Sequence, residues 1–330
     1  MRIQQIMLLL GVFALLALLG ACSPAEEASD TDTVGFECDR ACLIAQMNQY
    51  IEALVQHDSS GLPLAGAVKF TENTVAMQVG EGLWKTITAG PNDFKIYVAD
   101  PISGQVGLMG LIQNNNEPVI LAARLKVENQ EISEIEHLVT AAVGERSLPN
   151  LQAPRPTLVQ PLDPSEKVSR EQMLEAGYSY YEALVQDSGK VAPFADECQR
   201  RENGMTTANN QEPLPEGTPK DPVAGFMAMS SRMTCSDQID TNTMSYITSI
   251  DERRLFADEE MGLVFGYSMF THKSDITEVI IKGVPGIESR PYNYDPFNWP
   301  SAHIYKIRSG KIYEIEAIGA LADYGAKSGW

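Results

Sequence analysis

The amino-acid sequence predicts an α+β fold made of two tandem repeats, each with helices first and a curved antiparallel sheet after them. The main evidence is self-similarity, because the segment YIEALVQ at 50–56 returns as YYEALVQ at 180–186, 130 residues later. In addition, each copy opens with a helical stripe of apolar residues and continues with short alternating segments typical of strands. The chain is therefore predicted to be a duplicated domain.

The repeat continues beyond the helix. The same offset relates Pro63 to Pro193, and Glu72-Asn73 to Glu202-Asn203. Later blocks match with wider spacing, since ADPISG at 99–104 corresponds to ADEEMG at 257–262, and IxEIE recurs at 132–136 and 312–316. These matches place the repeats at 37–147 and 166–330, with the proline-rich segment 148–165 as a linker.

The expected helices cover 42–56 and 166–186, where apolar residues follow the helical period. The expected strands are shorter and rich in β-branched and aromatic residues. In the first copy they are 66–71, 75–79, 83–88, 94–99, 104–113, 117–127 and 131–142; in the second they include 243–250, 253–257, 262–272, 276–283, 301–308 and 311–319.

Composition excludes several classes of protein. Of the 330 residues, 44 are acidic and 25 basic, which gives a formal net charge of −19. Such a chain repels the phosphate backbone of nucleic acids and anionic membrane surfaces. Its hydrophobic content of 44% is normal for a globular protein and excludes bulk disorder.

The N-terminal segment is predicted to be an export signal. Residues 1–21 combine Arg2 with an apolar run and end in LGA before Cys22. This resembles a bacterial lipobox, which implies lipidation of Cys22 and an outer-membrane lipoprotein that faces the periplasm or the cell surface. An ordinary cleaved signal is the alternative. Residues 22–36 are predicted to be a flexible tether, so that the protein meets the membrane only through its lipid anchor.

Four further cysteines suggest two disulfides, because an even number in an oxidising compartment favours pairing. Cys38 and Cys42 lie one helical turn apart, and Cys198 would then pair with Cys235 across the polar stretch 203–222. A zinc half-site at Cys38 and Cys42 is the alternative, although no second pair of ligands follows at metal spacing. We expect no metal site.

The order of helices and strands resembles the nuclear transport factor 2-like superfamily, which includes ketosteroid isomerase and the SnoaL-like polyketide cyclases. That resemblance implies cone-shaped repeats, each with a pocket between helices and bent sheet. The segments CDRACL at 38–43, FTEN at 70–73, GLW at 82–84, RENG at 201–204 and YGAKSGW at 324–330 are more specifically similar to a tandem family of secreted bacterial and fungal proteins, largely uncharacterised in function.

Chemistry is expected to use side chains alone, because no nucleotide-binding, metalloprotease or nucleophile-elbow motif is present. The repeated pair Glu202-Asn203 is one candidate, with Glu202 as a base and Asn203 as a substrate ligand. We expect Arg201 to pair with Glu202 and to contribute to binding. The alternative is a structural turn, which the survival of the pair in both copies favours.

An aromatic insertion in the second copy is the other candidate. The segment 284–305 concentrates rings that could line a pocket for a flat ligand, whereas the first copy has a short hairpin there. Packing of this loop on the sheet is the alternative. The residues expected to bind substrate in this copy are Tyr292, Tyr294, Phe297, Trp299 and, on the helix, Tyr181.

His272 and His303 lie at the ends of two expected strands that can be neighbours in a bent sheet. One of them could face the cavity as an acid or base, oriented by Tyr305 or Asp258. Packed histidines, a core tyrosine stripe and a turn-capping aspartate are the alternatives.

Two functions remain open. The first is a cofactor-independent lyase, isomerase or hydrolase that acts on a small aromatic or hydrophobic molecule; benzylic or aryl ether cleavage of lignin-derived compounds is the specific reaction that the resemblance implies. The second is a non-catalytic ligand-binding or assembly lipoprotein of the cell envelope. We expect a monomer or a homodimer and no nucleic-acid partner.

Overall fold

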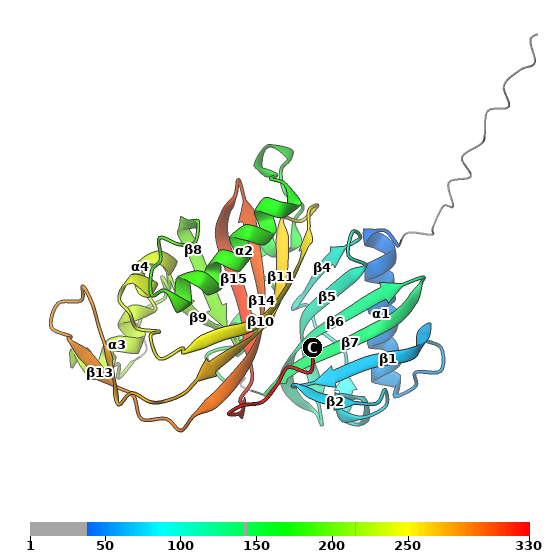
Figure 1. Cartoon of the computed structure of the whole chain (residues 1–330), viewed down its shortest axis with the longest axis horizontal. Coiled ribbons are helices and arrows are strands. Elements are labelled where there is room, and N and C mark those ends of the chain that lie inside the picture. The colour runs from blue at the N-terminus through cyan, green and yellow to red at the C-terminus, as the bar shows by residue number, and fades with distance from the viewer. Residues whose placement is uncertain (1–37, 142–143, 215) are drawn as a thin grey trace, which may run out of the picture. The chain divides into compact units, whose positions relative to one another are not determined.

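The computed structural model describes residues 38–330 apart from 142–143 and 215 (Figure 1). The predicted signal, the lipidation of Cys22 and the predicted tether lie outside the described residues. Within the described part, no helix is both long and apolar enough to cross a membrane.

Repeat 1 contains one long helix and a seven-stranded sheet. The side chain of Asp39 caps the helix by accepting a hydrogen bond from the Cys42 amide at 2.8 Å. Its elements are α1 (Arg40–Gln56), β1 (Leu64–Glu72), β2 (Val75–Met77), the 3₁₀ turn η1 (Gly82–Lys85), β3 (Ile87–Ala89), β4 (Lys95–Asp100), β5 (Gln105–Asn114), β6 (Glu117–Glu128) and β7 (Glu131–Thr140).

Repeat 2 follows the same order with additions. Ser169 and Gln172 form a capping box at the start of its long helix. Its elements are α2 (Arg170–Val185), β8 (Phe194–Glu202), β9 (Met205–Ala208), α3 (Pro222–Ser230), α4 (Cys235–Asp240), β10 (Ser249–Asp258), β11 (Leu263–His272), β12 (Glu278–Ile280), β13 (Ser289–Pro291), β14 (Phe297–Arg308), β15 (Lys311–Gly319) and β16 (Ala322–Asp323).

The two sheets share one topology, which confirms the predicted duplication. Their strand orders are β2-β1-β7-β6-β5-β3, with β4 also on β5, and β10-β11-β14-β15-β8-β9, with β16 also on β14. The register agrees as well, since Glu72 lies opposite His137 and Glu202 opposite Ala317. Both asparagines that follow these glutamates have a left-handed backbone, with φ of 46° and 47°.

One pairing in each sheet differs from the prediction of a purely antiparallel sheet. Strand β1 is parallel to β7, and β8 is parallel to β15. Each of these pairs joins the first and last long strands of its repeat, so the intervening chain provides the crossover that parallel strands require. Residue periodicity identifies strands but does not reveal the direction of their partners.

Other expected elements also differ. The predicted strand 83–88 is the turn η1 followed by β3, and residues 241–246 form turns rather than the start of a strand. Helices α3 and α4 were not predicted, because their segment is interrupted by glycine, proline and asparagine. The linker 148–165 contains the 3₁₀ turns η2 (Leu148–Leu151), η3 (Pro156–Val159) and η4 (Pro164–Glu166), and it packs against the repeats through Leu151, Leu158 and Leu162.

The repeats pack together through the outer faces of their sheets. One shared apolar core contains Ile96, Val98 and Met109 from repeat 1 together with Phe256 and Phe265 from repeat 2. Because alternate residues of a strand face opposite sides, the inner face of each sheet is left for its own helix. The described residues of the two repeats accordingly form one compact unit.

Reciprocal ion pairs border this interface. Asp258 accepts hydrogen bonds from Arg40 Nε at 2.9 Å and from the Ala99 amide at 3.1 Å. In the mirrored arrangement, Asp100 binds Arg170 and the Ala257 amide. Arg40 and Arg170 are again 130 residues apart, so the two repeats meet with approximate twofold symmetry.

The C-terminal residues that supported the family resemblance join the two repeats. The indole of Trp330 donates a hydrogen bond to Thr71 Oγ1 at 2.9 Å. Its ring also lies beneath three cations, with Lys69 Nζ at 4.0 Å, the Arg124 guanidinium at 4.5 Å and the Arg254 guanidinium at 5.1 Å from the ring centroid. Arg254 belongs to repeat 2 and the others to repeat 1.

Both predicted disulfides are present, Cys38–Cys42 and Cys198–Cys235. The second connects β8 to α4 and so anchors the inserted helices to the sheet. Two disulfides are typical of proteins that fold in an oxidising compartment, as exported proteins do.

We predict that Asp258→Asn and Asp100→Asn each lower the free energy of unfolding by about 1–3 kcal/mol, because each removes the charge of a buried carboxylate that pairs with a partly buried arginine. Urea unfolding of the two variants tests this, and the symmetry of the interface predicts similar losses. An Asp258→Asn variant of normal stability would contradict this structural role.

Candidate functional site

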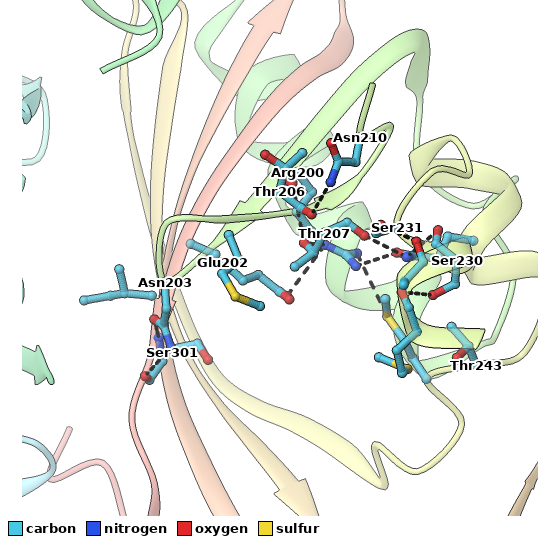
Figure 2. A pocket seen from close by; sticks show the side chains of 18 of the residues that line it. Arg200, Glu202, Asn203, Thr206, Thr207, Asn210, Ser230, Ser231, Thr243 and Ser301 are labelled. Atoms are coloured by element: carbon cyan, nitrogen blue, oxygen red, sulfur yellow. Dashed lines mark hydrogen bonds and ion pairs between the residues drawn. The ribbon is translucent and has the colours of Figure 1, made fainter. Parts of the chain in front are cut away.

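A cavity of about 1070 Å³ lies in repeat 2, between the inner face of the sheet and the segment that carries α3 and α4. Strands β8, β9, β11, β14 and β15 and helix α2 contribute the other walls. Its size is at the upper end of pockets that hold drug-sized molecules. Figure 2 shows Glu202 extending from β8 into the space between the strands and the segment with Ser230 and Ser231.

The corresponding region of repeat 1 is filled. Trp84, from the turn η1, is only 2% exposed and packs edge-on against Tyr50. The Tyr50 hydroxyl contacts His137 Nε2 at 2.8 Å, and His137 Nδ1 lies 3.2 Å from Glu72. In repeat 2 the segment between β9 and β10 is longer and turns away from the sheet, and the space stays open.

A buried cation and a carboxylate share the wall formed by β8. Arg200 is 1% exposed and donates hydrogen bonds to Gln238 Oε1 at 2.5 Å and to Thr207 Oγ1 at 3.0 Å. Glu202 lies 3.6 Å from Arg200 Nε and keeps nearly half of its side chain exposed. The charged pair therefore presents a carboxylate to the cavity.

The prediction that Arg201 pairs with Glu202 is wrong, because the partner is Arg200. Arg201 follows Arg200 on a strand, so the two side chains point to opposite faces of the sheet. Arg201 lies opposite Glu316 of β15, and burial lowers the pKa of its guanidinium. Arg201 does not line the cavity.

His303 faces the cavity from β14 and is surrounded by rings. Its ring centroid lies 5.5 Å from those of Tyr180 and Tyr181, and its ring stacks on Phe270 and Tyr305. Burial lowers the pKa of His303 to about 3, so the imidazole is neutral at neutral pH. Burial also raises the pKa of Tyr180 to about 12, which keeps its phenol protonated.

His272 lines another part of the cavity. Its ring stacks on Phe297 at 4.1 Å and on Tyr246 at 5.6 Å. Burial lowers its pKa to about 4, so this histidine is also neutral at neutral pH. Its Nδ1 atom is buried without a hydrogen-bond partner among the described residues.

The structure thus brings together part of the predicted site. Glu202, Asn203, His272, His303, Phe297 and Trp299 line the cavity. Four other predicted residues do not line the cavity. Tyr181 and Tyr305 are buried next to His303. Tyr292 stacks on Tyr246 and contacts the exposed Tyr294.

Asp258 is not part of this cavity, because it is held at the interface between the repeats. Asn203 borders the cavity but also has a structural role. Its side chain accepts a hydrogen bond from the Gly319 amide at 3.0 Å and donates to the Gly319 carbonyl at 3.3 Å. Asn73 does the same with Val139 in repeat 1. The asparagines of the repeated Glu-Asn pair therefore have the structural role at a turn that the sequence favoured.

Several lining residues were not predicted. Tyr180 could have been found from the repeat, since it aligns with Tyr50, and Arg200 from strand alternation with Glu202. Gln238, Thr243 and Tyr246 lie in the insertion between β9 and β10, where neither the repeat nor strand alternation identifies them. Within the described residues, no group of three or more histidine, cysteine or acidic side chains could hold a metal ion.

Comparison with protein-family models gives a match in the second half of the chain. Residues 166–319 match the model of a domain of unknown function (DUF8021). No curated protein has a sequence that matches the chain. Evidence on function therefore comes from the residues of the cavity.

Solved structures similar to the chain cover about half of it, the length of one repeat. A protein from Silicibacter sp. TM1040 described as a polyketide cyclase is 12% identical, covers 46% of this chain and 92% of its own, and has a TM-score of 0.28. A protein from Jannaschia sp. CCS1 described as a SnoaL-like polyketide cyclase has 11% identity, coverages of 48% and 90% and a TM-score of 0.28. A protein from Bacillus subtilis described as an isomerase is 9% identical, covers 46% of this chain and 87% of its own, and has a TM-score of 0.25.

We predict that Gly319→Val closes the cavity. A Cβ atom at Gly319 would lie 1.9 Å from Trp299 Nε1, so the indole would have to leave its place on the cavity wall. Val139 occupies the equivalent position in repeat 1. Calorimetry with 2-naphthol as a probe should show at least about tenfold weaker binding. Gly66→Val is the control, since nothing lies within 4 Å of that position; equal binding by both variants would contradict the prediction.

We also predict that His303 makes repeat 2 sensitive to acid. The folded-state pKa of about 3 is below the ordinary value of 6.5, so between these values the unfolded chain binds a proton that the folded chain does not. Its contribution to stability is complete above about pH 6.5 and is lost as the pH falls toward about 3.

Urea unfolding at about pH 7 and about pH 4.5 measures this effect. The wild type should lose about 2 kcal/mol more than His303→Phe between the two conditions, because phenylalanine keeps a ring there and does not titrate. Equal losses in the two proteins would show that His303 takes up its proton as readily when folded.

Proposed function

We propose that the cavity of repeat 2 is the active site of a cofactor-independent acid–base enzyme for an aromatic or otherwise hydrophobic molecule. The observation that carries the proposal is the juxtaposition of an open carboxylate, Glu202, with protonated Tyr180 and neutral His303 in a cavity lined by rings. Catalysis by positioned side chains needs a base and a hydrogen-bond donor on opposite parts of the substrate.

Glu202 is the proposed base. The other candidates for this role are His272 and His303, which are packed among rings and have pKa values of about 4 and about 3. Glu202 retains an exposed carboxylate at the cavity and lies 3.6 Å from Arg200 Nε. Tyr180 and His303 are assigned to hydrogen bonding with the substrate oxygen that gains negative charge.

Benzylic ether cleavage is the specific reaction that we propose for this arrangement. Glu202 would remove the proton of a para-phenol, and the ring would become a quinone methide as the benzylic C–O bond breaks. The leaving oxygen would take its proton from the Tyr180 phenol, and the proton that Glu202 removed would replace it. Tyr180 would hydrogen-bond to that oxygen as charge develops on it. The step is an elimination within the substrate, so it needs no oxidant, reductant or water.

The test is turnover of a panel of aryl ethers, epoxides and hydroxy-ketones by the purified protein without added cofactor. Glu202→Gln should lower kcat by about 10²–10⁴-fold while ligand binding persists, because the amide keeps the shape of the side chain and cannot accept the proton. Glu212→Gln, at another acidic residue that lines the cavity, is the matched control. Equal rates for Glu202→Gln and the wild type would exclude Glu202 as the base.

A binding protein without catalysis is the second candidate. The ion pair between Arg200 and Glu202 favours it, since that pair also has a structural role in the wall. Ligands that stabilise the protein against heat, with no turnover of any compound in the panel, would identify the cavity as a binding site alone.

A further inference from the structure

The two sides of the cavity differ in chemistry. Rings from β11 and β14 form one side, with Phe270, His272, Phe297 and Trp299. Hydroxyl and amide side chains gather on the side of β9 and the inserted helices, where Figure 2 shows Thr206, Thr207, Ser230, Ser231 and Thr243. A ligand that fits both sides has a flat apolar part and a part rich in neutral hydrogen-bonding groups.

The charges of the lining residues indicate an uncharged ligand. Arg200 is paired with Glu202 at 3.6 Å, and the other formally charged lining residues are Arg146 and Glu212, one of each sign. With both histidines neutral, the lining has no net charge, although the whole chain carries −19. Arg146 and Glu212 are exposed and opposite in sign, so the lining as a whole favours neither a negatively nor a positively charged ligand.

Of the buried side-chain polar atoms without a hydrogen-bond partner among the described residues, two belong to residues that line the cavity. Thr243 is 3% exposed and its Oγ1 makes no hydrogen bond; His272 is 4% exposed and its Nδ1 makes none. Buried polar atoms are usually satisfied, and both residues line the cavity, so the missing partners belong to a ligand or to water that a ligand replaces.

The cavity is larger than a single ring requires. Pockets of about 300–1,000 Å³ serve drug-sized molecules, and this cavity of about 1070 Å³ lies close to the upper limit of that range. A one-ring phenol would touch the ring-lined side and leave the hydroxyl-lined side to water.

From these observations we propose that the ligand is a neutral aryl glycoside. Its aromatic part packs on the ring-lined side, and its sugar, whose hydroxyls both donate and accept, binds the hydroxyl-lined side and Thr243. The proposal rests on the cavity being the functional site and names the class of ligand that it binds; it does not depend on the benzylic ether cleavage proposed above.

Calorimetry of the full chain with 2-naphthyl β-D-glucoside, 2-naphthol and glucose tests the proposal. The glucoside should bind at least about tenfold more tightly than 2-naphthol, and glucose should bind most weakly. Thr243→Val keeps the shape of the side chain but removes its hydroxyl, so it should abolish most of the glucoside's advantage and leave naphthol binding unchanged. Thr277→Val, an exposed threonine outside the cavity, is the matched control.

Equal or tighter binding of naphthol than of the glucoside would overturn the glycoside proposal and leave the proposed acid–base role of Glu202 intact. An advantage of the glucoside that Thr243→Val does not change would overturn the assigned sugar contact. Conversely, glucoside binding that follows the prediction, with turnover insensitive to Glu202→Gln, would support the ligand class while contradicting the proposed chemistry.

Discussion

Gln238 connects the segments that keep the cavity of repeat 2 open. Its amide nitrogen donates to the carbonyls of Thr207 on β9 and Ser230 on α3, at 2.7 and 2.9 Å, and its oxygen accepts from Arg200 on β8. The Cys198–Cys235 disulfide anchors the same helix to the same strand. A fully buried amide with these partners holds the inserted segment at a set position, where it bounds the cavity without filling it.

Repeat 1 shows what the same framework becomes when that space is filled. Each repeat places one histidine near the equivalent helix tyrosine, but the two histidines are not at equivalent positions. His137 lies on β7 opposite Ala123, whereas His303 lies on β14 opposite Ala317 of β15, the strand that corresponds to β7. In repeat 1 the histidine contacts Tyr50 and Glu72 beneath Trp84, as part of a packed core. Duplication thus leaves one copy to stabilise the shared sheet interface and the other free to line a cavity.

Much of the architecture could be predicted from the sequence, because the repeated YxEALVQ helix, the paired strands and the cysteines are local or recurring patterns. The candidate site could be predicted only in part. Phe297, Trp299, His272 and His303 lie in a recognisable aromatic segment or at strand ends, whereas Gln238 and Thr243 reach the cavity through an insertion whose path depends on tertiary contacts. Asp258 was predicted at the site and is not there. It recurs as Asp100 in the first copy because both carboxylates bind arginines at the interface between the repeats.

The most direct test of the account is a crystal structure of the protein soaked with a brominated planar phenol, with the bromine located by its anomalous scattering. We expect a bromine peak among Phe270, Phe297 and Trp299, with the phenol oxygen within hydrogen-bond distance of a polar side chain of the wall. A peak confined to the protein surface, or to repeat 1, would contradict the claim that the inner face of the second sheet is where this protein meets its ligand.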